Sequence, residues 1–219
     1  MHMLHDVLQR IKEFPEEPFI SRVCTPEQAE KLFNWNDVSE LIRTNENKFE
    51  LINQDNKKIS VKEINQPWHG TVQDKSTIYE NILDGLGFVI INQSYYNKSM
   101  NRLSADIESS LKKATDIHVY GAYDGSGKSF TAHSDPTSNI IVQLDGTSLW
   151  RIYAEKLDQV PRDKTHLLTE VINQKLYPGM VAYIPNRTYH KCEPLSKRLS
   201  LSFAIHSNIH PHTREEYIL

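Results

Sequence analysis

The chain has 219 residues, a formal net charge of −3 and 24% charged residues, which is typical of one globular domain of moderate size with a substantial core. The charges are interspersed and no long run carries one sign, so we expect no nucleic-acid partner. No apolar stretch approaches the roughly 20 residues that a membrane-spanning helix needs, so we expect no membrane partner either.

The first 70 residues are expected to form an extension of helices and a hairpin that packs on the main domain. The threonine, proline and glutamine within residues 25–28 are typical of a capped helix start, so a helix is predicted over residues 26–33. A second short helix should follow it. Residues 48–52 and 58–62 alternate in polarity around an Asp-Asn turn, which predicts a β-hairpin.

Residues 71–207 are expected to form the main domain, and residues 208–219 a C-terminal tail. Ser76 should cap a helix that ends at Gly85, and apolar residues at three- and four-residue steps predict another over residues 100–111. Short strands are then predicted at residues 117–123, 129–134, 138–144, 147–153, 175–184 and 198–205. Many short strands after a helical lead-in are typical of a jelly-roll barrel, so the predicted fold class is mainly β with flanking helices.

Three residues indicate a metal site. His133 and Asp135 stand two apart, and residues i and i+2 of a strand lie on the same face, so an imidazole and a carboxylate can meet at one point. His190, from a distant strand, adds a second imidazole. Two histidines and one carboxylate cover one face of an octahedral ion and leave positions open, which suits non-haem Fe(II) that must bind a co-substrate and O2.

Two longer motifs surround these ligands. Residues 133–153 read HSDPTSNIIVQLDGTSLWRIY, in which the HxD pair runs into a strand ending Gln-Leu-x-Gly and then into Leu-Trp-Arg-x-Tyr. Residues 177–190 read YPGMVAYIPNRTYH, with a Pro-Gly turn, an apolar strand, a second proline and the histidine. Over roughly residues 75–207 the chain resembles the JmjC-type cupin oxygenases, most closely the ribosomal-oxygenase-like branch.

The resemblance implies a double-stranded β-helix (cupin) barrel and an Fe(II)- and 2-oxoglutarate-dependent oxygenase that uses O2 to hydroxylate its substrate. His133, Asp135 and His190 would hold the iron, and no catalytic side chain beyond these ligands is expected. The substrate would be a protein or peptide side chain, or a small amino-acid-like metabolite. Two alternatives stay open: a cupin metalloenzyme that does not use 2-oxoglutarate, and a non-catalytic cupin binding module. The sequence carries no signal for an oligomeric state.

The co-substrate site departs from the family pattern. The family usually has a lysine or arginine fifteen residues after the first histidine to hold the 2-oxoglutarate carboxylate, and here this position is Ser148. A buried dicarboxylate needs a cationic partner, so the salt bridge has moved or the co-substrate has been lost. Arg198 and Ser200 resemble an Arg-x-Ser element of other 2-oxoglutarate oxygenases and are the first choice, with Lys128 second. The alternative for Arg198 is a surface arginine.

The alternation of side chains between the two faces of a strand adds further candidate site residues. Counting by twos from Asp135 places Asn139 on the metal face, either as a contact for the co-substrate or as a satisfied core amide. The alternating polar residues of the last predicted strand would face water in an ordinary half-exposed strand, whereas in a small barrel with an aqueous site they would face the interior. On the strand before the motif, Tyr123 is a candidate donor to a carboxylate, while Tyr120 is expected to be a packing residue.

The two cysteines, Cys24 and Cys192, are too few for a disulfide framework and fit a reducing compartment, so we expect a cytoplasmic protein. Cys192 follows His190 by two residues. It would be a small half-buried residue or part of the lining of the site.

Overall fold

The computed structural model describes residues 3–44, 48–53, 55–66, 70–94, 96–125, 127–157, 159–160 and 162–207. The helices are α1 (His5–Glu13), α2 (Pro26–Glu30), α3 (Trp35–Thr44), α4 (Lys75–Leu83), α5 (Lys98–Leu111) and the 3-10 helix η1 (Arg162–Leu167). The strands are β1 (Phe19–Arg22), β2 (Phe49–Ile52), β3 (Lys58–Ile59), β4 (Glu63–Gln66), β5 (Gly70–Gln73), β6 (Gly87–Ile90), β7 (Thr115–Ala122), β8 (Ser138–Asp145), β9 (Ser148–Lys156), β10 (Glu170–Leu176), β11 (Met180–Ile184), β12 (Thr188–Pro194) and β13 (Arg198–Ile205). The predicted C-terminal tail, residues 208–219, lies outside the described residues.

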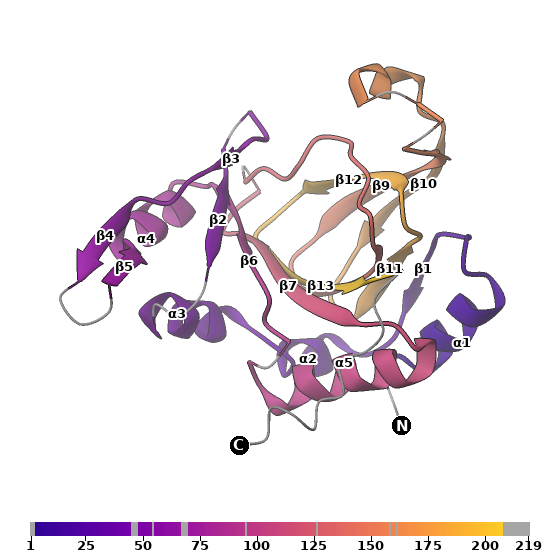
Figure 1. Ribbon diagram of the computed structural model, residues 1–219, viewed down its shortest axis with the longest axis horizontal. Coiled ribbons are helices and arrows are strands. Elements are labelled where there is room, and N and C mark those ends of the chain that lie inside the picture. The colour runs from indigo at the N-terminus through magenta and orange to yellow at the C-terminus, as the bar shows by residue number, and fades with distance from the viewer. Residues whose placement is uncertain are drawn as a thin grey trace.

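Two antiparallel sheets form the walls of a barrel (Figure 1). The larger sheet has eight strands in the order β1-β11-β8-β13-β7-β6-β2-β3, and the smaller has three in the order β10-β9-β12. Outside the larger sheet, α2 packs against β8 and α5 packs against β7 (Figure 1). The predicted fold class, a mainly β double-stranded β-helix with flanking helices, is confirmed.

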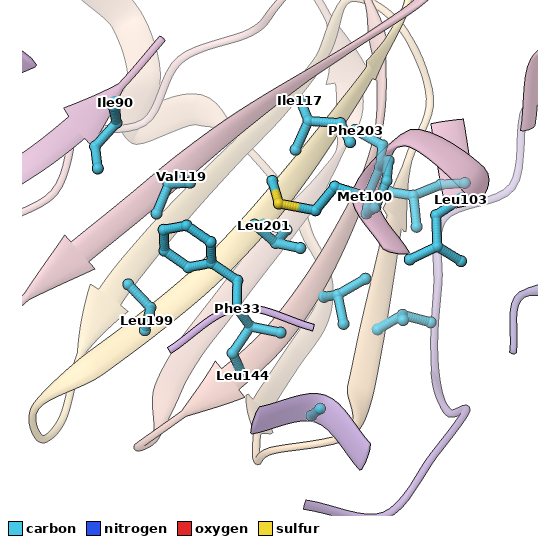
Figure 2. Close-up of a cluster of buried hydrophobic side chains, with 14 of the residues drawn as sticks. Phe33, Ile90, Met100, Leu103, Ile117, Val119, Leu144, Leu199, Leu201 and Phe203 are labelled. Carbon is cyan, nitrogen blue, oxygen red and sulfur yellow. The ribbon is translucent and has the colours of Figure 1, made fainter. Parts of the chain in front are cut away.

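In the larger sheet, β13 carries its apolar side chains on the outside of the barrel. Leu199, Leu201 and Phe203 project from β13 into a buried cluster that includes Met100 and Phe33 (Figure 2). Helices cover this outer face, so the apolar side chains of β13 are removed from water there. Ile141, Ala182 and Ile184 of the same sheet pack inside the barrel against the smaller sheet. The alternate, polar residues of β13 therefore face the interior, as the sequence predicted.

Several predicted elements are confirmed. At the start of α2 the Thr25 hydroxyl accepts a hydrogen bond from the Gln28 amide (3.3 Å), and the Gln28 side chain accepts one from the Thr25 amide (3.0 Å). α3 and α5 lie at the predicted helical stretches, and β2 pairs with β3 as the predicted hairpin. β7, β8, β9 and β13 begin and end within three residues of the predicted strands.

Three other predictions are wrong. Residues 129–134 form no strand and contribute one isolated bridge. The predicted strand at residues 175–184 is divided between β10 and β11 by a turn, because Gly179 takes a positive φ of 83° that ends the extended conformation. Asp74 rather than Ser76 caps α4, since its carboxylate accepts the Ser76 amide (3.1 Å).

The first 70 residues contribute strands to the larger sheet. β1 pairs with β11, and β2 pairs with β6. Buried apolar side chains from both parts of the chain, beginning with Leu4 and ending with Ile205, belong to one cluster. Among the described residues, no helix combines the length and apolar character needed to cross a membrane.

Candidate metal centre

The backbone sets the two histidine candidates directly opposite each other. His133 lies in a loop and forms an isolated antiparallel bridge with His190 on β12. Residues that pair directly present their side chains on one face, so the two imidazoles point the same way, with ring centroids 4.4 Å apart. His190 was expected on a distant strand, and β12 is that strand, although no bounds were predicted for it.

Asp135 completes the cluster. Its Oδ1 lies 3.9 Å from His133 Nε2, and its Oδ2 lies 3.6 Å from His190 Nε2. The ligand atoms of the three residues all lie within 4.8 Å of one another. In the part of the chain that the structure describes, no second group of three His, Cys, Asp or Glu side chains brings its ligand atoms so close.

Hydrogen bonds to carbonyl groups fix the tautomer of both rings. Nδ1 of His133 lies 2.8 Å from the Thr131 carbonyl oxygen, and Nδ1 of His190 lies 3.0 Å from the Thr188 carbonyl oxygen. A carbonyl only accepts, so each Nδ1 carries the proton. Both Nε2 atoms then present their lone pairs toward Asp135, which is the arrangement that metal-binding histidines need.

Neighbouring groups also hold Asp135. The side-chain amide of Asn139 donates to Asp135 Oδ2 (3.0 Å), leaving Oδ1 for a ligand. The backbone amide of Arg187, which has a left-handed φ of 61°, donates to the Asp135 carbonyl oxygen (2.7 Å). The second contact ties the loop that carries Asp135 to the turn before β12. Asn139 therefore orients the carboxylate of a candidate metal ligand.

Burial keeps His190 neutral. Removal from water, together with the nearby His133 ring, lowers the pKa of His190 to about 4. Metal binding needs the unprotonated imidazole, so the buried ring is held in the form that coordinates an ion.

A cavity of about 30 Å³ lies between the sheets beside these ligands. It is lined by Tyr120, Ser129, Phe130, His133, Asp135, Ile141, Trp150, His190, Cys192, Arg198, Ser200 and Ser202. Arg198 and Ser200, the first-choice co-substrate residues, thus share a cavity with the three ligand candidates. The alternative of a surface arginine is wrong, because Arg198 is only 2% exposed.

Two buried donor atoms in this cavity lack partners. The Arg198 Nη1 lies 2.5 Å from the Cys192 sulfur, whereas Arg198 Nε and the Ser200 hydroxyl have no hydrogen-bond partner. Burying a guanidinium without a carboxylate is costly, so these atoms are suited to an anionic ligand. The donor set fits a dicarboxylate that also reaches the metal ligands, and the two histidines with one carboxylate fit Fe(II).

Ser148, where the family usually has a cation, is fully buried and belongs to a neutral chain of hydrogen bonds. Its hydroxyl donates to Gln143 Oε1 (2.8 Å) and accepts from the Trp150 indole (3.0 Å). Burial raises the pKa of the Cys192 thiol, and the Arg198 charge and the Ser148 hydroxyl offset part of this rise. Cys192 also contacts Arg198. The guanidinium, which comes from the larger sheet, therefore lies in the same part of the barrel as Ser148, which comes from the smaller sheet.

The remaining predicted contacts lie elsewhere. Tyr123 is 43% exposed, and its ring packs edge-on against Trp35. The Lys128 ammonium contributes to the lowered pKa of Glu193, which is due mainly to Arg151. Neither Tyr123 nor Lys128 has a contact with the ligand candidates in the described structure, and both stay predictions.

Tyr120 was expected to be a packing residue, but it lines the cavity directly opposite Ser200 in the β7–β13 register. Burial raises the pKa of its hydroxyl, so the phenol stays protonated and available as a donor. Tyr120 alternates with the apolar Ile117 and Val119 along β7, which was the available signal, but this alternation alone does not say which face turns inward.

Comparison with protein families agrees with this geometry. The family model described as "JmjC domain" matches residues 90–215, which is more than half of the chain. A curated relative from Drosophila erecta, bifunctional lysine-specific demethylase and histidyl-hydroxylase NO66, is 25% identical over 124 residues. This alignment covers 53% of the present chain and 19% of the relative.

Solved structures give the same fold. The ribosomal oxygenase YcfD from Escherichia coli superposes with a TM-score of 0.61 at 17% identity, over 94% of this chain and 52% of that one. A second YcfD structure, in complex with cobalt and 2-oxoglutarate, has a TM-score of 0.58 at 17% identity and covers 94% and 53%. At this identity the likeness establishes the fold. The chain spans about half the length of YcfD and about a fifth of NO66.

Proposed function

The chain belongs to the JmjC domain family, and from this premise we propose that it is an Fe(II)- and 2-oxoglutarate-dependent oxygenase that hydroxylates its substrate. The observation that carries the proposal is one cavity with two contrasting ends. At one end are the metal-ligand candidates, and at the other are Arg198 and Ser200 with unpartnered buried donor atoms.

His133, Asp135 and His190 would hold the iron through the two Nε2 atoms and a carboxylate oxygen. When bound, the iron supplies the oxidative chemistry, in which O2 and 2-oxoglutarate are consumed, succinate and CO2 are released and a substrate C–H bond is hydroxylated. Asn139 keeps the Asp135 carboxylate turned toward the site. The Thr131 and Thr188 carbonyls keep both imidazole lone pairs available.

Three donors would hold the far carboxylate of 2-oxoglutarate. Arg198 offers a charged, two-pronged partner, and the Ser200 hydroxyl adds a further donor. Tyr120 faces Ser200 across the β7–β13 register and supplies a third hydroxyl. Arg198 thus replaces the cation that the family has at the position of Ser148. Arg198 is only 2% exposed, and the low polarity of a buried site strengthens such charge pairing.

We further propose a protein or peptide side chain as the substrate. His133 and Asp135 are about one-third exposed, so the metal side of the cavity opens to solvent while the Arg198 end is closed. An exposed opening can receive a side chain from a large partner. The names of the two relatives, a histidyl-hydroxylase and a ribosomal oxygenase, describe activities of that kind in those proteins. A cytoplasmic location, consistent with the unpaired Cys24 and Cys192, is part of the same proposal.

One observation favours a second candidate, a cupin metalloenzyme that does not use 2-oxoglutarate. A cavity of about 30 Å³ has room for one or two water molecules, so a five-carbon dicarboxylate enters only if the Arg198–Cys192 contact opens. The test must therefore measure 2-oxoglutarate binding itself.

The decisive experiment is an anaerobic titration of the Fe(II)-loaded protein with 2-oxoglutarate, in which the visible metal-to-ligand charge-transfer band is recorded. We expect a saturable band for the wild type. Arg198→Met, which keeps the length of the side chain but removes the charge, should weaken 2-oxoglutarate binding by at least about 30-fold, as expected for a buried charged hydrogen bond. A wild-type protein that binds iron but gives no band would favour the second candidate.

A double variant that moves the positive charge to position 148 provides a second test. Ser148→Lys combined with Arg198→Met returns the cation to the usual family position, on the opposite wall of the same cavity end. We expect the double variant to recover part of the affinity that Arg198→Met loses. Ser148→Lys alone should not tighten binding, because it places two cations at one end of the cavity.

A further inference from the structure

Lys197, the residue immediately before Arg198, is held on the outer side of the barrel. Arg198 pairs with Ala122 in the β7–β13 register, which brings Tyr123 beside Lys197 at the end of both strands. Lys197 lies in the bend just before β13, and its ammonium meets Trp35 and Tyr123, whereas the Arg198 side chain lines the cavity. The position of one side chain therefore constrains the other.

Two aromatic rings bind the Lys197 ammonium. Its Nζ lies 4.5 Å from the centroid of the Trp35 ring and 5.1 Å from the centroid of the Tyr123 ring. The two rings are 5.6 Å apart and perpendicular, so the cation faces both. Trp35 opens α3, in the N-terminal part of the chain, whereas Tyr123 follows β7. Contacts of this geometry stabilise a cation by electrostatic attraction to the ring faces.

The β8–β9 turn holds the same residue through its backbone. A Cβ on Gly146 would lie 1.5 Å from the Lys197 carbonyl oxygen, so the turn approaches as closely as a glycine allows. The Thr147 amide donates to the Ser196 hydroxyl (2.9 Å) next to Lys197. The Trp35 indole donates to the Asp145 carboxylate (2.8 Å), which ties the ring itself to this turn.

Arg198 needs such external support. It is the first residue of β13, where a strand frays most easily, and its guanidinium donates to the Cys192 sulfur while its Nε is unpartnered. Inside the cavity, the hydrogen bond of the guanidinium is therefore to a weak acceptor, the Cys192 sulfur. The contacts on Lys197 supply a restraint from outside the barrel.

We propose that Trp35, Tyr123 and Lys197 form a clamp that positions Arg198 for the carboxylate of 2-oxoglutarate, so that residues far from the metal set co-substrate affinity. The inference rests on the proposed function and deepens it. It makes Trp35 and Lys197 positioning residues rather than contacts of the co-substrate. It also gives the N-terminal segment a role in the site, and it gives Tyr123 a role other than direct carboxylate binding.

The test compares two variants, each of which removes a cation that lies over an aromatic ring. Lys197→Met removes the charge over Trp35 and Tyr123, and Arg10→Met removes the guanidinium that lies 4.2 Å over Phe19 in α1 and β1. The dissociation constant for 2-oxoglutarate is measured by the anaerobic band of the Fe(II)-loaded protein, and kcat by succinate release. Thermal unfolding of the metal-free protein reports stability separately.

We expect Lys197→Met to weaken 2-oxoglutarate binding about three- to tenfold with little change in kcat at saturation, because only one cation–π anchor is lost. Lys197→Arg keeps the cation and should bind within about twofold of wild type. Arg10→Met should leave the affinity for 2-oxoglutarate unchanged, even if its melting temperature falls as far as that of Lys197→Met. Tyr123→Leu, which removes one ring, should give a smaller loss of affinity in the same direction.

The outcomes separate the two proposals. A wild type without the band overturns the proposed function and the clamp with it. A wild type with the band but with unchanged affinity in Lys197→Met overturns the clamp alone. Equal weakening in Arg10→Met would show a general effect of lower stability and also overturns the clamp. Should Lys197→Met not fold, Tyr123→Leu decides the matter by the same comparison.

Discussion

His133 and His190 exchange two backbone hydrogen bonds: the His133 amide donates to the His190 carbonyl oxygen (3.0 Å), and the His190 amide donates to the His133 carbonyl oxygen (2.8 Å). This single bridge joins the loop of the HxD motif to β12. The main chain therefore holds both imidazoles on one side before any ion binds. A site organised in this way requires little rearrangement to take up a metal.

Removing an exposed ligand should abolish metal binding and leave the fold intact. His133 and Asp135 are about one-third exposed, so His133→Ala or Asp135→Ala should change the stability of the metal-free protein by less than about 1 kcal/mol. Iron-dependent succinate release should vanish in both. His206→Ala is the matched control, because His206 also pairs with an aspartate (Asp116, 2.8 Å) but lies outside the ligand cluster. Turnover in His133→Ala at the wild-type rate would refute the metal assignment.

Loss of the hydrogen bond to Asp135 should weaken metal binding without removing a ligand. Asn139→Ala frees Asp135 Oδ2, and such outer contacts typically change metal affinity by about 10- to 100-fold. Competition with a coloured chelator measures the effect. Thr137→Ala, which loses only a 3.4 Å contact with Asn139, should change the affinity far less. Equal effects in the two variants would mean that Asn139 does not act through Asp135.

The metal-free protein should lose stability as the pH falls from about 6.5 toward 4. The folded state lowers the pKa of His190 to about 4, whereas an unfolded chain takes up a proton near the ordinary value of 6.5. The unfolded state therefore binds more protons in this pH range. Acid thus lowers the free energy of unfolding, by up to about 3 kcal/mol. His190→Gln cannot take up this proton. The free energy of unfolding in urea should therefore depend less on pH in the variant than in the wild type. If the two proteins show the same pH dependence, His190 is not the cause of the acid destabilisation.

Two glycines with the same backbone conformation should tolerate alanine very differently. Gly70 and Gly146 have φ values of 67° and 66°, so alanine strains both by about 1 kcal/mol. A Cβ at Gly70 meets nothing within 4 Å, whereas at Gly146 it would lie 1.5 Å from the Lys197 carbonyl oxygen. Gly146→Ala should therefore cost at least about 3 kcal/mol of unfolding free energy. Equal denaturation midpoints would show that the turn can move away from β13.

Local patterns predicted the candidate ligands and the positions of most strands of the barrel. The spacing of His133 and Asp135, the motif around His190 and the alternation along β13 are visible in the sequence because they follow from the geometry of adjacent residues. The choice of Arg198 over a surface arginine also began with that alternation. Such features involve residues that are close together in the sequence, so they can be recognised before the fold is known.

The tertiary structure decided which faces and which partners those residues have. Helices on the outside of the larger sheet turn the polar face of β13 inward, and this places Tyr120 in the cavity and Tyr123 outside it. The loop of His133 replaces a predicted strand because its hydrogen bonds go to β12, far along the chain. The contacts of Trp35 with Lys197 likewise join segments about 160 residues apart. No local pattern encodes such pairings, because they arise only when distant strands and helices bury their surfaces together.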